Sequence, residues 1–270
     1  MIKFDSHVHT RFSSDSEANP KDYIELAIKK GMKGICFTDH NDFDFPLEEG
    51  KVVFNLDFET YLKYMFELKE EYKDTFDIRI GLEQGLMKSV ARRVDEYDKN
   101  KKLDFIIGSS HLVEGEDPYY PAFWEGRQVK ETITKYYEST LENVKNCHNF
   151  DVYGHLDYII RYAPNKDKDY NWMDYYDYFY EILKLLIYQG KGIEVNTSGL
   201  KSGLKNPNPD INIVKLYKEL GGEIISIGSD SHSVEYLGYE FDRVYNMLKE
   251  LGFKYYSVFK GRKAEFYEIL

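Results

Sequence analysis

Histidine and acidic residues recur along this chain at or near the ends of short apolar runs. Six of the seven histidines lie there, and all but one of the segments also bring Asp or Glu. The segments are Asp5–His9, Thr38–His40, Gly81–Glu83, Ser109–His111, Gly154–Asp157 and Gly228–His232. Imidazole and carboxylate groups are the usual ligands of borderline divalent metals. Because scattered structural histidines would not fall so regularly at strand ends, the pattern predicts a metal-dependent enzyme.

The pair His7 and His9 is the most compact of these clusters. Side chains alternate across a strand with a period of two, so both imidazoles point to the same side and can bind one ion. Paired histidines also occur on exposed strands, and the pair alone is a weak signal. Its weight comes from the five other clusters.

Seven strand-like runs alternate with helical patterns, and several runs are continuously apolar, as strands buried on both faces are. The runs are Ile2–Asp5, Gly34–Phe37, Ile78–Leu82, Asp104–Ile107, Val152–Gly154, Gly192–Val195 and Glu223–Ile227. The helical patterns cover about 20–30, 57–73, 87–101, 129–148, 171–190, 210–220 and 240–251. The tail, at Tyr255–Phe259 and Ala264–Tyr267, is compatible with an extra edge strand or a pair of strands.

Connection lengths indicate how these elements are arranged. Helix-to-strand connections are short and marked by glycine, whereas the segments after the strands are long. The long segments are Asn41–Leu56, Leu112–Gln128, Arg161–Tyr170 and Thr197–Pro209. Long functional loops at the carboxyl ends of the strands are typical of a (β/α) barrel. The sequence therefore predicts an α/β fold, a (β/α) barrel of seven strands with its active site at that face.

Composition excludes several classes of function. A chain of 270 residues fits one barrel, and its net charge of −11 argues against binding nucleic acid through a broad basic face. No apolar run has membrane-spanning length, and Met1–Phe4 leads directly into a strand, so neither a membrane partner nor a signal peptide is predicted. Cys36 and Cys147 are interpreted as reduced core residues of a cytoplasmic protein.

The histidine and acidic segments, together with Ser14–Ser16, resemble in order and spacing the PHP (polymerase and histidinol phosphatase) family. The resemblance runs from Met1 to about Tyr256 and is closest to the family's monofunctional histidinol-phosphate phosphatases. It implies a single domain over residues 1–270, a distorted (β/α)7 barrel. The substrate part of the resemblance is less specific, and includes Phe37–His40, Gly154–Tyr162 and Glu194–Thr197.

The resemblance also implies a site for two to three divalent transition metals per chain, Zn, Mn or Fe. The first ion would be bound by His7, His9, Glu83 and Asp230, the second by Glu83, His111 and His155, and the third by Asp15, His40 and His232. Many family members have a histidine at the position of Asp15. A carboxylate there favours manganese or iron and leaves the metal identity open. Taken alone, Asp15 could equally cap a helix.

Other residues near these motifs have less direct interpretations. Asp5 and Asp39 are expected to orient ligand histidines through the ring nitrogen that faces away from the metal, and Asp157 to do so for His155. His148 lies outside every motif and is interpreted as an ordinary surface or helix-end histidine. The tyrosine-rich stretch Asp174–Tyr180 is better explained by barrel packing than by stacking on a ligand.

Arg161 is the main candidate for binding a phosphate, because a guanidinium presents a planar fork to two oxygens. Its alternative interpretation is an ion pair at the rim with Asp157 or Asp167. Lys201, Asn196 and Arg11 are further candidates for substrate binding. The catalytic set predicted from the resemblance is Arg161, Glu83 and Asp230.

The predicted reaction is hydrolysis of L-histidinol phosphate to L-histidinol and phosphate, in histidine biosynthesis, by a water that the metals activate. Three divalent ions would turn the formal charge of the ligand set from −3 to +3, which suits an anionic ester. One alternative is a phosphoesterase for nucleotides or other small phosphates, and another is a non-catalytic, metal-stabilised binding domain. The chain is expected to be a monomer or a small homo-oligomer.

Overall fold

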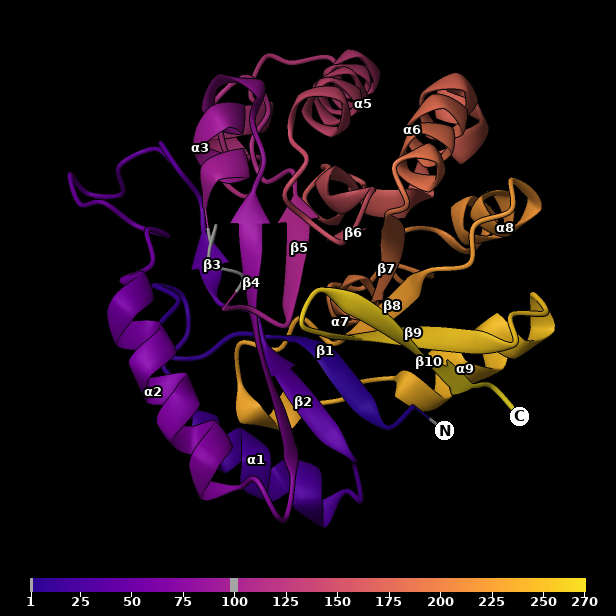
Figure 1. The fold of residues 1–270 in the computed structure, drawn as a ribbon. Helices are drawn as coiled ribbons and strands as arrows, with labels where there is room; N and C mark the ends of the chain where they lie inside the picture. Colours follow the sequence, from indigo (N-terminus) through magenta and orange to yellow (C-terminus); the bar gives the residue numbers. More distant parts are fainter. Residues whose placement is uncertain (1, 98–101) are drawn as a thin grey trace.

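The computed structural model describes residues 2–97 and 102–270, and its centre is a ring of seven parallel strands (Figure 1). Around the ring these are β1 (Phe4–Val8), β2 (Gly34–Phe37), β4 (Asp77–Gly85), β5 (Phe105–Ser109), β6 (Val152–Tyr153), β7 (Gly192–Asn196) and β8 (Ile225–Gly228). All seven predicted strands are present, with ends that differ by a few residues. The fold is a distorted (β/α)7 barrel, as predicted.

The ring closes between its first and last strands through backbone bonds beyond the end of β8. His9 N donates to Ser231 O at 2.9 Å, and Asp230 N donates to His7 O at 2.8 Å. A bridge between Val8 and Ser231 lies between these two bonds. The closure therefore runs through the two segments that carry predicted metal ligands.

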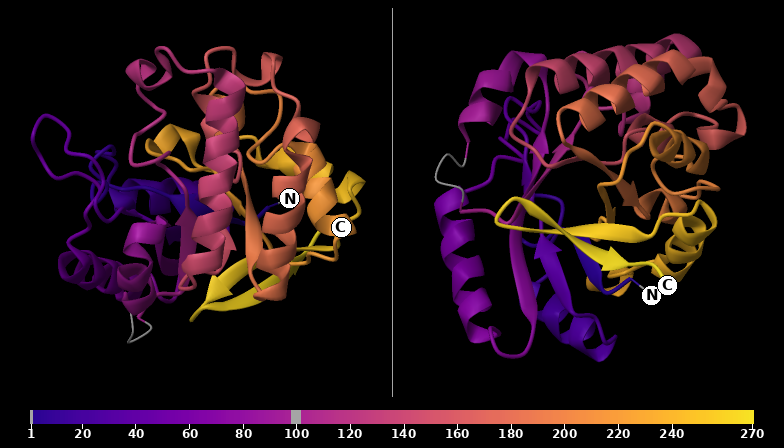
Figure 2. Two further views of the ribbon diagram at one scale, coloured as in Figure 1. Left: turned by 90° about the horizontal axis from the view of Figure 1, so that it is seen from above. Right: turned by 45° about the vertical axis from the view of Figure 1, so that its right-hand side comes forward.

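Helices lie around the outside of the ring (Figures 1 and 2). They are α1 (Pro20–Lys29), α2 (Phe58–Glu71), α3 (Ala91–Glu96), α4 (Pro121–Trp124), α5 (Val129–Asn146), α6 (Tyr176–Tyr188), α7 (Ser198–Lys201), α8 (Ile211–Glu219) and α9 (Phe241–Glu250). The 3-10 turns are η1 (Lys88–Val90), η2 (Tyr158–Arg161), η3 (Lys166–Lys168), η4 (Trp172–Tyr175) and η5 (Val234–Tyr236). None of the helices among residues 2–97 and 102–270 has the length and apolarity to cross a membrane.

Most predicted helices are found at their expected places. Helix α1 begins as expected, since the Asn19 side chain accepts from Lys21 N, Pro20 takes the first position, and Gly31 follows with a φ of 68°. The pattern at 87–101 gives only η1 and the short α3, and 98–101 lie outside the described residues. The short helices α4 and α7 within the long loops were not predicted.

A short extra strand, β3 (His40–Asn41), continues the line of β2 after a break at Thr38 and Asp39. Strand β4 is long enough to pair with β2 through its first half and with β3 through its second. The break is held in place because Thr38 Oγ1 accepts from Val8 N at 3.1 Å. As a result His40 lies directly beside Glu83 in the sheet.

The tail forms an antiparallel hairpin of β9 (Tyr255–Lys260) and β10 (Lys263–Glu268). Of the two predictions for the tail, an edge strand or a pair of strands, the pair is confirmed. The hairpin contacts the amino-terminal ends of the barrel strands: Gly261 N donates to Asp104 Oδ1, and the Arg262 Nε donates to Asp151 Oδ2. Its other anchor is the buried Arg79 on β4, which binds Glu265 and the carbonyl oxygen of Phe259. The hairpin also contacts the segment before β1, because Lys3 N donates to the Tyr256 hydroxyl at 3.1 Å.

A small apolar cluster fills the barrel interior where the hairpin covers it. Phe259 stacks on Phe105 with ring centroids 4.7 Å apart, and Cys36, Ile107 and Val152 complete the cluster. The predicted metal ligands lie at the opposite ends of the strands. The apolar residues that stabilise the barrel are therefore at one end of the strands, and the residues predicted to bind metal are at the other end.

We expect Phe259→Ala to lower the free energy of unfolding by about 3–5 kcal/mol, because it removes a buried aromatic ring and leaves a cavity. The exposed Phe266 on the same hairpin gives the matched control, and Phe266→Ala should change stability by only about 0.5 kcal/mol. Urea unfolding measures both. Equal losses in the two variants would show that the hairpin does not close the barrel interior.

Candidate metal centre

The centre of the site is the carboxylate of Glu83, which is fully buried on β4. Its Oε2 atom lies 3.3 Å from both His7 Nε2 and His9 Nε2. Its Oε1 atom lies 2.8 Å from His155 Nε2 and 3.1 Å from His111 Nε2. The two oxygens therefore face two different pairs of imidazoles, which is the arrangement of a carboxylate that bridges two ions.

Most distances within the first group of ligand atoms are those of a tetrahedral site. His7 Nε2 and His9 Nε2 lie 2.9 Å apart, and Asp230 Oδ1 lies 3.6 Å and 3.4 Å from them. Ligand atoms about 2.0–2.2 Å from a tetrahedral zinc lie roughly 3.3–3.6 Å from one another. The distances from the two imidazoles to Asp230 Oδ1 and Glu83 Oε2, at 3.3–3.6 Å, match this spacing, whereas the imidazole nitrogens lie closer to each other. These three atoms and Glu83 Oε2 could therefore bind one divalent ion.

The third group lies nearer the surface. Asp15 Oδ2 is 3.0 Å from His232 Nε2 and 3.7 Å from His40 Nε2. Helix α1 is capped by Asn19, so the alternative interpretation of Asp15 as a helix cap is wrong. His40 also faces inward, because its Nδ1 lies 3.0 Å from Glu83 Oε2. The structure thus brings all nine predicted ligands into one cluster, and the division of these ligands among ions stays a prediction.

Within the described part of the chain, some polar atoms in the cluster have no hydrogen-bond partner and are suited to bind a metal ion. Glu83 Oε2 and His40 Nδ1 are buried and have no hydrogen-bond partner among the described residues, although they lie close together. Buried polar atoms are normally satisfied, and a divalent cation would satisfy both. Within each of three sets the ligand atoms lie within 4.8 Å of one another: His7, His9 and Asp230; His9, His40 and His232; and His40, Glu83 and His111.

Charges in the cluster favour the carboxylate forms that bind metals. Burial disfavours an anion at Glu83, but the imidazoles of His7, His111 and His40 outweigh it and hold the pKa of Glu83 well below its usual range. Burial likewise opposes charge on Asp230, where His7, His9 and Arg161 keep the pKa well below the ordinary value. Both side chains are therefore anionic at neutral pH.

The backbone conformation of Asp230 is unusual, and it helps to place the carboxylate beside His7 and His9. Its φ of 53° lies in the left-handed region, which Asp tolerates better than most residues. The bond from Asp230 N to His7 O holds this conformation, and Arg161 Nη1 donates to Asp230 Oδ2 at 2.9 Å. The other oxygen, Oδ1, is thereby left toward His7 and His9.

Two carboxylates that orient ligand imidazoles were missed by the sequence analysis. Glu194 Oε1 lies 2.6 Å from His7 Nδ1, and Asp42 Oδ1 lies 2.6 Å from His111 Nδ1. Both leave the Nε2 atom of the histidine free for a metal. Two signals were present: Glu194 interrupts an apolar strand, and Asp42 follows His40 by two residues, on the same side.

The residues predicted to orient histidines do something else. Asp5 accepts from Ser229 N and Oγ and from the backbone N of His7 and of Gly238, so it fixes backbone rather than a ring. Asp157 accepts from Asp210 N and is bonded to the Asn208 side chain, not to His155.

Asp39 acts on a ligand ring only indirectly. Ser13 Oγ donates to Asp39 Oδ1 at 2.8 Å and lies 3.1 Å from His9 Nδ1. His148 is exposed and outside the cluster, as expected. The stretch Asp174–Tyr180 runs into α6, whose buried Phe179 packs in the core, so the packing interpretation is confirmed there.

Arg161 is buried under the cluster rather than placed at the rim. Its three nitrogens donate to Asn208 Oδ1, Asp230 Oδ2 and Asn196 Oδ1, at 2.7, 2.9 and 2.8 Å. Within the described residues its ion pair is with Asp230, so the alternative of a rim pair with Asp157 or Asp167 is wrong. Arg161 nevertheless lines the pocket above the cluster.

The other predicted substrate contacts fare differently. Asn196 is fully buried beside Glu194 and Asp230 and does not line the pocket, so it supports the ligands rather than the substrate. Lys201 does line the pocket, with its Nζ 3.8 Å from the ring centre of Tyr236. Arg11 is exposed against Tyr64 and does not reach the lining, which contradicts its predicted role.

The pocket above the cluster has a volume of about 640 Å³. Seven predicted ligands form part of its lining: Asp15, His40, Glu83, His111, His155, Asp230 and His232. The remaining lining includes residues of the long loops at 41–56 and 112–128, among them Phe45, Glu48 and Asp117. This volume suits a small ligand rather than a polymer.

Comparison with known proteins gives consistent matches. The family model described as "PHP domain" matches residues 5–198. The histidinol-phosphatase of Lactococcus lactis subsp. lactis is 32% identical over 98% of this chain and 97% of its own length. A "Probable histidinol-phosphatase" of Clostridium acetobutylicum is 33% identical over 93% of this chain and 94% of its own.

A solved structure agrees with these sequence matches. The crystal structure of the Lactococcus lactis histidinol phosphate phosphatase, complexed with Zn, L-histidinol and phosphate, superposes with a TM-score of 0.87. The two chains are 31% identical, and the match covers 97% of this chain and 98% of the other.

We expect Glu194→Gln to weaken the binding of divalent ions about ten- to a hundredfold, because the amide no longer fixes the tautomer of His7. Competition with a chromogenic chelator measures the affinity without any substrate. The matched control is Glu223→Gln, an exposed carboxylate that precedes β8 at the other end of the barrel. Unchanged affinity in Glu194→Gln would mean that Glu194 serves only packing.

Proposed function

We propose a function from one premise: the chain belongs to the PHP domain family. It is a metal-dependent phosphate-monoester hydrolase that converts L-histidinol phosphate to L-histidinol and phosphate, in the cytoplasm and as a step of histidine biosynthesis. The observation that carries the proposal is the cluster of nine predicted histidine and carboxylate ligands that is centred on Glu83, with the buried Arg161 beside it. Full-length similarity to a phosphatase complexed with Zn, L-histidinol and phosphate supports the substrate.

The cluster would hold two to three divalent ions, Zn, Mn or Fe, with Glu83 as the bridging ligand. Such ions acidify a bound water to near-neutral pKa and offset the negative charge of a phosphoryl group. Uncatalysed hydrolysis of phosphate monoesters is among the slowest reactions in biology, so strong charge stabilisation is needed. The proposal treats residues 1–270 as one domain, because the barrel and the hairpin share their buried contacts.

Arg161 is the residue of this chain that we assign to the phosphate. A guanidinium has five N–H groups, and the three bonds described above leave one N–H on each terminal nitrogen. The bonds to Asn208, Asn196 and Asp230 fix the plane of the fork, so little entropy is lost when it binds an anion. Lys201, at the lining of the same pocket, is the second cation available there.

A substrate panel on protein of measured metal content tests the proposal. We expect kcat/KM for L-histidinol phosphate to exceed that for adenosine monophosphate and for glucose 6-phosphate by about tenfold or more, which is ~1.4 kcal/mol of transition-state binding. Chelation should abolish phosphate release and re-addition of a divalent ion should restore it. A preference for the nucleotide would replace the substrate, and full activity with under one ion per chain would overturn the metal site.

We expect Arg161→Ala to lower kcat/KM about ten- to a few hundredfold, the size of one charge-assisted bond of ~1.5–3 kcal/mol or slightly more. Arg161→Lys should recover only part, since a point charge lacks the planar fork. Elemental analysis should show unchanged metal content, because arginine is not a ligand. The exposed Arg243 gives the control Arg243→Ala. If activity falls only in step with metal content, Arg161 supports Asp230 and does not bind phosphate.

A further inference from the structure

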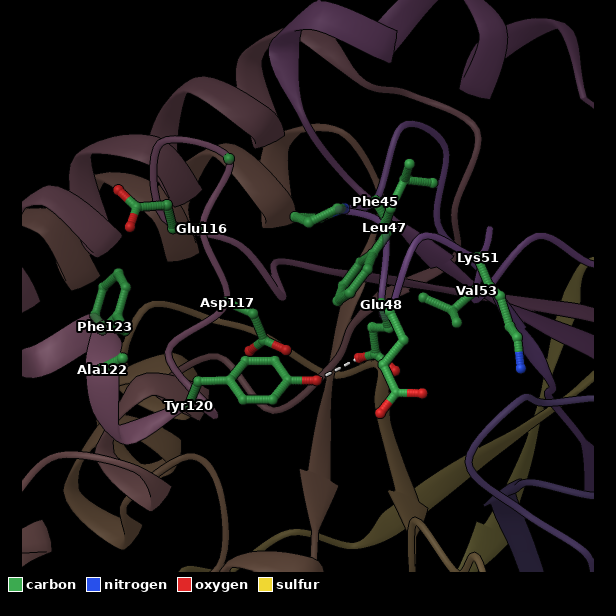
Figure 3. A pocket seen from close by; sticks show the side chains of 13 residues that line it. Phe45, Leu47, Glu48, Lys51, Val53, Glu116, Asp117, Tyr120, Ala122 and Phe123 are labelled. Atoms are coloured by element: carbon green, nitrogen blue, oxygen red, sulfur yellow. Dashed lines mark hydrogen bonds between the residues drawn. The ribbon is translucent and has the colours of Figure 1, made fainter.

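Arg161 lines the pocket above the metal cluster and not the outer pocket beside it. The outer pocket lies between the loops that follow β3 and β5, and its lining includes Glu48 and Tyr120 (Figure 3). The hydrogen-bond partners Asn196 and Asn208 are fully buried and line neither pocket. These two residues can therefore affect a bound anion through Arg161 but not by direct contact.

Two of the three groups that accept a hydrogen bond from Arg161 are side-chain amides. Asn208 Oδ1 accepts from Arg161 Nε at 2.7 Å, and Asn196 Oδ1 accepts from Arg161 Nη2 at 2.8 Å. The oxygen and the NH2 group of an amide have nearly the same shape but opposite hydrogen-bonding roles. An amide turned by half a rotation would place a donor against the donating guanidinium. Each amide must therefore be held with its oxygen toward Arg161.

The amide of Asn196 is held by residues close to it in the sequence. Its Nδ2 atom donates to Glu194 Oε2 at 3.0 Å, and its Oδ1 atom also accepts from Ser198 N at 3.0 Å. The first contact lies within β7, and the second comes from the start of α7. The orientation of Asn196 is thus fixed from both ends of the amide.

The amide of Asn208 depends instead on a distant residue, Asp157. Asn208 Nδ2 donates to Asp157 Oδ1, 51 positions away in the sequence, and makes a longer contact of 3.4 Å with Asp157 O. The backbone of Asn208 is held separately, since it exchanges two bonds with the backbone of Asn196, at 2.7 and 2.9 Å. The backbone bonds place the side chain, and Asp157 holds the NH2 end of the amide away from Arg161.

Asp157 is a buried acid that belongs to none of the predicted metal sites. It is 3% exposed, and within the described residues it forms no ion pair. Its Oδ1 atom accepts from Asn208 Nδ2, and its Oδ2 atom accepts from Asp210 N at 2.9 Å. A carboxylate buried without a cation is unfavourable unless hydrogen bonds satisfy it. Asp157 is therefore satisfied by the two groups that it holds, the Asn208 amide and the start of α8.

We propose that Asn208 and Asp157 are positioning residues for the phosphate, and that both act through Arg161. Asp157 holds the Asn208 amide with its oxygen toward Arg161 Nε, and this bond fixes the third corner of the guanidinium. The two terminal nitrogens then present their remaining N–H groups to the anion in a fixed plane. The inference rests on the proposed function, because it takes Arg161 as the group that binds the phosphate.

Three substitutions test the positioning role. Asn208→Leu keeps the approximate size of the side chain and removes its amide, whereas Asn208→Asp keeps an oxygen toward Arg161 Nε. Asp157→Leu removes the acid that orients Asn208. The matched control is Asp210→Ala, which removes the side-chain cap of α8 but keeps the backbone N–H that Asp157 accepts. Thermal unfolding and elemental analysis show whether each variant is folded and carries its metal.

We expect Asn208→Leu to lower kcat/KM for L-histidinol phosphate about tenfold, because a buried Nε–H is left unsatisfied and Arg161 loses its fixed plane. Asn208→Asp should recover most of the loss, and Asp157→Leu should lose about three- to tenfold. In an Arg161→Ala background each substitution should cost less than about twofold, since the residue through which both act is gone. Metal content should not change, and Asp210→Ala should keep wild-type kinetics.

Calorimetric titration with inorganic phosphate gives a second measurement, which needs no turnover. The affinity of the metal-loaded protein for phosphate should fall in Asn208→Leu by a factor similar to that in kcat/KM. The affinity for L-histidinol, which has no phosphate, should stay the same.

The inference is overturned if Asn208→Leu keeps wild-type kinetics, or if it costs as much in the Arg161→Ala background as in the native chain. Additive losses would mean that Asn208 supports the fold independently of Arg161. If Asn208→Leu does not fold, Asp157→Leu carries the same comparison. Failure of the proposed function has a different signature, since the wild-type protein then releases no phosphate from the ester. The phosphate titration still decides the inference in that case, and a wild-type protein that binds no phosphate overturns both.

Discussion

The structure depends on keeping one buried carboxylate, Glu83, ionised among imidazoles. An isolated anion inside a protein would become protonated, since burial strongly disfavours charge. Here the rings of His7, His111 and His40 reverse that preference and hold the pKa of Glu83 low. The barrel is what makes this arrangement possible. Only the convergence of several strand ends places so many nitrogen atoms around one side chain of β4.

The contacts that close the barrel between β1 and the segment after β8 also bring predicted metal ligands together. The backbone bonds that join β1 to the segment after β8 lie at His7, His9 and Asp230. Strand pairing thus fixes three ligands before any metal binds, and Glu194 and Arg161 then fix the orientation of a ring and of a carboxylate. At the opposite ends of the strands the hairpin of β9 and β10 covers the interior with apolar side chains, so the core at that end does not depend on the loops at the site.

The ligand positions could be predicted from the sequence because strand periodicity and long loops after strands are local signals. His7 and His9 share a side of one strand, and their destination follows from the parallel arrangement. Partners across the barrel could not be predicted in this way. Glu194 orients His7 from 187 residues away, whereas the neighbouring Asp5 binds the backbone. How deeply a side chain is buried below the pocket also cannot be predicted from the sequence, and for this reason Asn196 was predicted to contact the substrate.

The pocket has a gradient of charge from its floor to its opening. With divalent ions held by the cluster, the floor near Arg161 and Glu83 would attract an anion, whereas Asp117 and Glu48 line the outer part and have no ion pair among the described residues. A phosphate ester of an amino alcohol carries opposite charges at its two ends. Such a molecule has one favourable orientation in this field, and its reverse places like charges together at both ends. The metals alone would attract any small phosphate ester, and the rest of the pocket lining comes largely from the long loops that follow the strands.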